Sequence, residues 1–344
     1  MTRRWIVLIA VLGLIPILLA MRPVDDVLLK AAFKGDLGEV NTQIKKEADV
    51  NTANTFGFTP LLVATKKGHR EIVALLLDHG AEVTQATANG ESPLYVAAEQ
   101  GHREIVSLLL DHGAEVTQAT TNGTTPLIVA AEQGHRKIVS LLLGHGAEVT
   151  QATTDGATPL YMAAQQGHRD IVALLLAHGG GVEQTKTNGV TPLFIATQNG
   201  HRETVGLLLA NGADVEQARK NDGTTPLFIA TQNGHRGTVG LLLANGANIK
   251  QTRTDGASPL FIAAENGHRD IVALLLDHGA DVTQATTNNS MTAMHVAALH
   301  GHREIVALLL KHGADKSVKA TTGHRPVDFA RQQGYSALVP LLEP

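Results

Sequence analysis

The chain has 344 residues, a formal net charge of −4, only 3% aromatic residues and no cysteine. Without cysteine, disulfides, thiol nucleophiles and cysteine-based zinc sites are excluded. The negative charge argues against a nucleic-acid partner, because duplex binding needs a basic face that releases phosphate counterions. The scarcity of aromatic residues argues against an interface built on tryptophan and tyrosine anchors.

Residues 1–22 differ from everything that follows them. Arg3 and Arg4 precede an unbroken apolar run, 5–21, which is the pattern of an export signal. On the far side of the run, Arg22 is the only basic residue that directly follows it. The positive-inside rule therefore predicts a cytoplasmic N-terminus and exported repeats.

Two fates of this leader stay open. As a signal-anchor helix it would hold the protein on a membrane with the repeats outside the cytoplasm, although the apolar run is at the short end for a spanning helix. As a signal peptide cleaved after Ala20 it would release a secreted or periplasmic protein, but Leu18 is bulky where cleavage favours a small residue. A buried hydrophobic helix that caps the repeats is the third interpretation.

From about residue 26 onward, a short motif recurs roughly every 33 residues. Thr-Pro-Leu or Ser-Pro-Leu begins at Thr59, Ser92, Thr125, Thr158, Thr191, Thr225 and Ser258, with looser copies at Asp26, Thr292 and Arg325. A fixed period of this size predicts small stacked units that share one continuous core.

One unit shows how each is expected to fold. Thr125 is placed to cap a short first helix, with Pro126 at its first position and Gly134 at its end. A second helix is expected through residues 138–143, ending at Gly146. An extended, threonine-rich finger that turns at Asp-Gly then leads to the next unit.

The succession T-P-L-x-x-A, G-H-x-x-I-V and L-L-L-x-x-G-A resembles the ankyrin repeat. The resemblance implies an all-α repeat solenoid of stacked helix-turn-helix units with projecting β-hairpin-like fingers. About ten units, including degenerate end caps, would fill residues 23–344. They would start near residues 26, 59, 92, 125, 158, 191, 225, 258, 292 and 325.

The chain departs from the family where a histidine usually follows T-P-L. Only His295 keeps it, and residues such as Tyr161, Phe194 and Phe228 stand there in other units. We expect packing to compensate for the lost hydrogen bonds, in the form of a column of aromatic rings between units.

The 17 histidines suggest a metal protein at first sight. Most of them recur at two repeat positions, so neighbours should stand roughly 8–10 Å apart, the spacing of packed helices. Zinc needs its nitrogens at about 2 Å, which such neighbours cannot provide. We therefore predict structural histidines, no metal site and no cofactor, with His295, His300 and His302 as the one group that could converge on an ion.

A column of arginines follows the Gly-His pairs. Its members are Arg70, Arg103, Arg136, Arg169, Arg202, Arg236, Arg269 and Arg303. The column could be a stripe for an anionic partner. Most of its members are followed by an acidic residue, which favours a solvated and charge-balanced face.

Two second helices are expected to be weak. Gly206, Gly237 and Gly240 lie inside them, and each interior glycine costs about 1 kcal/mol relative to alanine. The spacing from Thr191 to Thr225 is also one residue longer than the period, which places an extra residue in the intervening finger. We predict a soft segment over residues 200–245.

The resemblance implies a protein-binding scaffold, because ankyrin repeats bind partners mostly on fingertips and on the concave face of the first helices. The candidate partner-binding residues are Glu99, Gln100, Asn122, Glu132, Gln133, Asp155, Gln165, Gln166, Asn188, Gln198 and Asn199. We expect a monomer that binds a protein, contacts no nucleic acid and meets a membrane only through residues 5–21.

Two rival functions remain. An enzyme is disfavoured, because every acidic residue or histidine that could act in catalysis has a twin one period away, and no nucleophile, phosphate-loop or zinc-protease motif occurs. A structural spacer without a specific partner is the stronger rival, because the predicted binding surface is uniform and poor in anchors.

Overall fold

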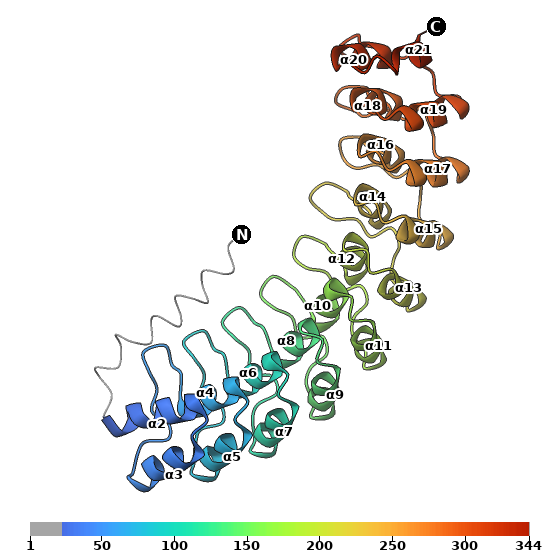
Figure 1. Ribbon diagram of the computed structural model, residues 1–344. Coiled ribbons are helices and arrows are strands. Elements are labelled where there is room, and N and C mark those ends of the chain that lie inside the picture. Colours follow the sequence, from blue (N-terminus) through green and yellow to red (C-terminus); the bar gives the residue numbers. More distant parts are fainter. Residues whose placement is uncertain (1–22, 344) are drawn as a thin grey trace. The chain divides into compact units, whose positions relative to one another are not determined.

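The computed structural model describes residues 23–343, which form ten successive helix pairs (Figure 1). The first helices are α2 (Pro23–Lys34), α4 (Pro60–Lys67), α6 (Pro93–Gln100), α8 (Pro126–Glu132), α10 (Pro159–Gln166), α12 (Pro192–Gln198), α14 (Pro226–Gln232), α16 (Pro259–Glu265), α18 (Ala293–Leu299) and α20 (Pro326–Gln332). The second helices are α3 (Leu37–Lys45), α5 (Arg70–Asp78), α7 (Arg103–Asp111), α9 (Arg136–Gly144), α11 (Arg169–Ala177), α13 (Arg202–Ala210), α15 (Arg236–Ala244), α17 (Arg269–Asp277), α19 (Arg303–Lys311) and α21 (Val339–Leu342). This arrangement confirms the predicted all-α repeat fold.

The described chain divides into two compact units. The first holds the residues up to Met162 together with 177–180, and the second holds 163–176 and the residues from Gly181 onward. Within each unit, first helices pack against the first helices of neighbouring pairs and second helices against second helices. The connecting fingers project beyond the layer of first helices (Figure 1).

The first helices begin and end where local chemistry predicts. The Thr125 hydroxyl accepts a hydrogen bond from the Ile128 backbone N–H at 3.2 Å, and Pro126 opens α8 without losing a needed donor. Gly134 follows the helix with a left-handed φ of 82°. The same hydroxyl cap forms at Thr59, Ser92, Thr158, Thr191, Thr225 and Ser258. Removing one such cap typically costs about 1 kcal/mol.

The second helices supply much of the core. In α9 the side chains of Ile138, Val139 and Leu142 are almost fully buried. Burying each such side chain stabilises the fold by roughly 1.5–3 kcal/mol. A helix pair alone could not cover this face, so the units must stack.

The fingers are hydrogen-bonded turns that connect to one another. In one finger Thr120 N donates to Thr124 O at 3.0 Å, and Gly123 N donates to Thr120 O at 2.8 Å. The finger carbonyl of Asn122 accepts from Thr154 N of the next finger at 2.9 Å. Between residues 23 and 343 no strand forms, and the one isolated β-bridge joins Ala285 to Thr292. The fingers are therefore hairpin-like in path without being β-ladders.

Two fingers accommodate an extra residue. In the finger that follows α13, Arg219 N donates to Thr224 O, five residues away, as the repeat spacing predicted. A second insertion, which we did not predict, lies where Thr286 N donates to Met291 O. There Ser290 takes a left-handed φ of 53°, the conformation that glycine holds in the other fingers.

The predicted signal peptide or signal anchor, residues 1–22, lies outside the described residues. Among the helices from α2 to α21, none has the length and apolar character needed to cross a membrane.

Candidate functional site

The predicted partner-binding residues occupy two kinds of position and both compact units. Glu99, Gln100, Asn122, Glu132, Gln133 and Asp155 belong to the first unit, and Gln165, Gln166, Asn188, Gln198 and Asn199 to the second. Eight of them sit at or just after the C-terminal ends of first helices, and Asn122, Asp155 and Asn188 sit on fingers. Each unit therefore carries candidate residues of both kinds.

At the first-helix ends, each pair has one half-buried and one exposed residue. Gln100 and Gln133 are exposed, and the preceding Glu99 and Glu132 are half-buried. The Gln100 amide donates to the Glu99 carboxylate at 2.9 Å. These side chains form a polar edge that solvent and a partner can reach.

Asn199 has a structural bond that the sequence did not reveal. Its side-chain amide donates to the Gln165 backbone carbonyl of the preceding pair at 2.7 Å. Asn233 donates in the same way to Gln198 O at 2.8 Å. The asparagines at this position therefore connect adjacent pairs, and only part of each side chain is available to a partner.

The three fingertip candidates also build the fingers. The Asn122 side-chain oxygen accepts from the Thr124 backbone N–H and hydroxyl, at 3.2 and 2.8 Å. Asp155 accepts from the Thr153 hydroxyl at 2.6 Å, and the Asn188 oxygen accepts from Val190 N at 3.1 Å. These bonds fix the side chains in one orientation, so a partner would meet a preorganised edge.

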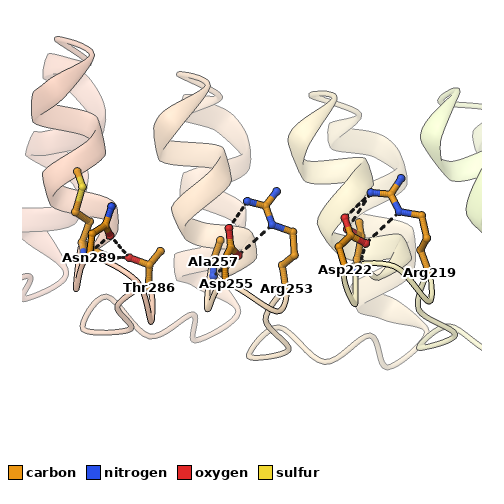
Figure 2. A network of polar contacts seen from close by, with 9 residues as sticks. Arg219, Asp222, Arg253, Asp255, Ala257, Thr286 and Asn289 are labelled. Carbon is orange, nitrogen blue, oxygen red and sulfur yellow. Dashed lines mark hydrogen bonds and ion pairs between the residues drawn. The ribbon is translucent and has the colours of Figure 1, made fainter.

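Two arginine–aspartate clamps in the second unit went unpredicted (Figure 2). Arg219 donates to both carboxylate oxygens of Asp222, from Nε at 3.1 Å and from an Nη at 2.6 Å. Its guanidinium also lies 5.7 Å from the ring centroid of Phe194 in the preceding first helix. A bidentate pair that also stacks on a ring is among the stronger arrangements available near a surface.

The next finger repeats this clamp. Arg253 binds Asp255 with the same two-pronged geometry, and its guanidinium lies 5.2 Å from the Phe228 centroid. The hydrogen bond from Arg219 holds the pKa of Asp222 well below its usual range, and Arg253 lowers the pKa of Asp255 in the same way. Both carboxylates therefore stay ionised at neutral pH.

The sequence signal for the clamps was a substitution at one repeat position. Several other fingers have a threonine at this place, as where Thr286 donates to Asn289 in the finger after α17 (Figure 2). Two of the residues that replace the family histidine, Phe194 and Phe228, are buried, and an arginine guanidinium lies over each ring. The expected column of aromatic rings stays a prediction.

The pKa values of two tyrosines at the same repeat position, Tyr95 and Tyr161, are also shifted. Tyr95 is half-buried, and burial, followed by the charges of Glu99, Glu91 and Glu132, raises its pKa. Burial and the charge of Asp155 raise the pKa of Tyr161 to about 12. Both phenols remain protonated hydrogen-bond donors at neutral pH.

The Gly-His pairs connect neighbouring units, as the structural interpretation predicted. His135 Nε2 lies 3.1 Å from the Glu99 carbonyl oxygen of the preceding first helix. Its ring lies over Gly101, where a Cβ would come within 2.7 Å of the imidazole. The same contact to a preceding carbonyl forms at His69, His201, His235, His268 and His302.

The histidines that could have converged on an ion do not do so. His295 is fully buried, with Nδ1 3.1 Å from Thr292 N and Nε2 3.1 Å from Val318 O. Burial lowers its pKa, so it serves as a neutral helix cap. His300 and His302 stack on each other at 6.0 Å. Across residues 23–343, no three histidine, aspartate or glutamate side chains are grouped as metal ligands.

Three members of the arginine column, Arg103, Arg169 and Arg269, form ion pairs with acidic neighbours. Arg103 lies 3.7 Å from Glu104, and Arg269 lies 3.0 Å from both Asp270 and Glu304. All of these side chains are more than half exposed, so each pair contributes at most about 1 kcal/mol. For these arginines the charge-balanced interpretation holds.

Comparison with known proteins gives one short curated match. Over 57 residues the chain is 46% identical to a 2-5A-dependent ribonuclease of Mus musculus, which is 16% of this chain and 8% of that protein. The chain thus spans less than a tenth of the length of this relative, and the likeness concerns only that stretch.

The family comparison covers far more of the chain. The family model described as ankyrin repeats (3 copies) matches residues 28–120, 116–187, 174–253 and 236–320. These overlapping matches include nearly all of the helix pairs, with their capped first helices, Gly-His connections and fingers. The chain therefore belongs to the ankyrin repeat family.

Proposed function

We propose that this protein is an interaction scaffold that binds another protein through the first-helix ends and fingertips of its units. Reversible surface recognition is its mechanism. The observation that carries the proposal is the polar edge formed by Gln100, Gln133 and the equivalent residues of other units. These side chains are exposed, and hydrogen bonds between neighbouring pairs fix the backbone that carries them. A rigid edge loses little conformational freedom on binding, which favours affinity even without large anchors.

The surface favours an extended partner. Its candidate residues carry amides and carboxylates, and a single pair offers few contacts. A segment that touches several successive pairs gains strength through avidity. We further propose that residues 1–22 export the repeats and tether them to a membrane, or release them after cleavage, because of the basic and apolar pattern of that segment.

A photo-crosslinking amino acid placed at Gln133 tests the binding proposal in the native host. We expect one saturable crosslinked product, lost when the neighbouring Gln100 is changed to Arg. The same crosslinker at Glu71, on a second helix, is the matched control and should give no such product. A spacer, the alternative function, would give no saturable product from either position.

The proposed export is tested separately by N-terminal sequencing of the mature chain and membrane fractionation. An intact N-terminus in the membrane fraction supports a tether, and a chain that starts near Met21 in the soluble exported fraction supports cleavage. A full-length chain that stays in the cytoplasm would contradict the export proposal and leave the binding proposal standing.

A further inference from the structure

A hollow lies on the second-helix layer of the first compact unit, on the opposite layer from the proposed binding edge. It is an open depression of about 360 Å³, lined by Arg103, Arg136, Lys137 and Ser140. Arg103 comes from α7 and the other three from α9, the second helices of two adjacent pairs that pack together. The lining thus combines three cationic side chains with one hydroxyl.

The repeat pattern is broken at this hollow. The residue after the arginine is acidic in six units and glycine in one, and it is basic only at Lys137. Three residues later Ser140 supplies a hydroxyl, as Ser107 does in the preceding unit, where four other units have alanine and two have glycine. Because the seven other copies show that the fold does not need a lysine here, Lys137 calls for another explanation.

The cationic charge at the hollow is only partly balanced. Arg103 lies 3.7 Å from Glu104. Arg136 and Lys137, both exposed, form no ion pair with an acidic side chain of the described chain. Two uncompensated positive charges and a hydroxyl therefore face one small volume.

We propose that this hollow binds a single phosphate group carried by a serine or threonine of a partner protein. A phosphorylated side chain brings a charge of about −1.5 to −2 and three acceptor oxygens. Arginine guanidinium groups match such an oxyanion with paired N–H donors, and a lysine adds a compact charge. The site is independent of the proposed scaffold edge, because it lies on the other helix layer.

The surroundings favour a phosphorylated segment over an anionic membrane or a nucleic acid. Exposed Glu104 and Asp111 lie on α7 itself, and the whole chain carries a net charge of −4. An extended anionic surface would be repelled by these acidic residues. A single phosphate on a flexible segment can enter the hollow while the rest of the segment avoids them.

The test titrates the full chain into a glycine–serine peptide that carries one phosphoserine. Phosphorus NMR measures binding of the peptide. We expect saturable binding of the phosphopeptide, no binding of its unphosphorylated form and competition by inorganic phosphate. Lys137→Glu introduces an acidic residue, as six other units have at this position, and should fold normally by circular dichroism. It should weaken binding by about tenfold or more, because it removes one charge-assisted contact and adds repulsion.

The matched control is Lys311→Glu, which makes the same charge change on α19, far along the chain from the hollow. It should leave phosphopeptide affinity unchanged. Equal affinity in the Lys137→Glu and wild-type proteins, or no phosphopeptide binding at all, would overturn the proposal. Sedimentation with phosphatidylserine vesicles in the absence of peptide binding would overturn it in favour of a membrane site.

Discussion

At the scale of single residues, the Arg219–Asp222 clamp links charge, an aromatic face and a finger turn. Asp222 accepts from Arg219 and also from Thr224 N at 3.1 Å. We predict that Asp222→Asn, which keeps the bond to Thr224 but loses the charge, lowers the free energy of unfolding at pH 7 by about 1 kcal/mol. Urea denaturation measures this difference.

The effect should depend on pH, because the folded-state pKa of Asp222 is depressed. A depressed carboxyl pKa contributes stability that is fully present above the unfolded value of about 3.9 and is lost as pH falls toward the folded value. The difference between wild type and Asp222→Asn should therefore shrink below about pH 4. Asp111→Asn, at an exposed site on α7, is the control and should leave the free energy of unfolding at pH 7 nearly unchanged. An unchanged difference at pH 3 would contradict this assignment of the pKa.

At the scale of helices, α13 and α15 carry the glycines that define the predicted soft segment. A Cβ at Gly206 would meet Leu241 Cδ2 at 3.6 Å, an ordinary van der Waals distance. We predict that Gly206→Ala stabilises the protein by up to about 1 kcal/mol and slows amide exchange in residues 200–245. Gly200→Ala is the contrasting control. Gly200 has a φ of 77°, and its Cβ would lie 2.7 Å from His235, so that change should destabilise.

The same scale shows what could be predicted from the sequence. Helix boundaries followed from local rules, because the Thr125 hydroxyl and Gly134 act within their own turn. The contact of Asn199 with the Gln165 carbonyl could not be predicted, since it depends on a side-chain rotamer across two pairs. The Arg219 clamp also went unpredicted, although an arginine where several other fingers have threonine was a signal that could have revealed it.

At the scale of the whole molecule, stability rests on contacts between neighbouring pairs, because each pair buries its apolar faces only against the next. His135 contributes one such contact through its bond to Glu99 O, whereas His145 Nδ1 bonds at 2.9 Å only to Leu141 O of its own helix. A lost hydrogen bond that spans two pairs should loosen both of them. A lost bond within one helix end should not.

We predict that His135→Phe, which keeps a ring over Gly101 but removes the Nε2 bond, destabilises the protein by about 1 kcal/mol. Amide exchange should become faster in both α6 and α8. The increase in rate should become smaller in pairs farther along the chain. His145→Phe is the matched variant, and its exchange changes should stay at the end of α9. If both variants altered exchange in the same residues, the histidine contacts would not be what couples neighbouring ankyrin units, and packing of the apolar faces alone would have to carry that coupling.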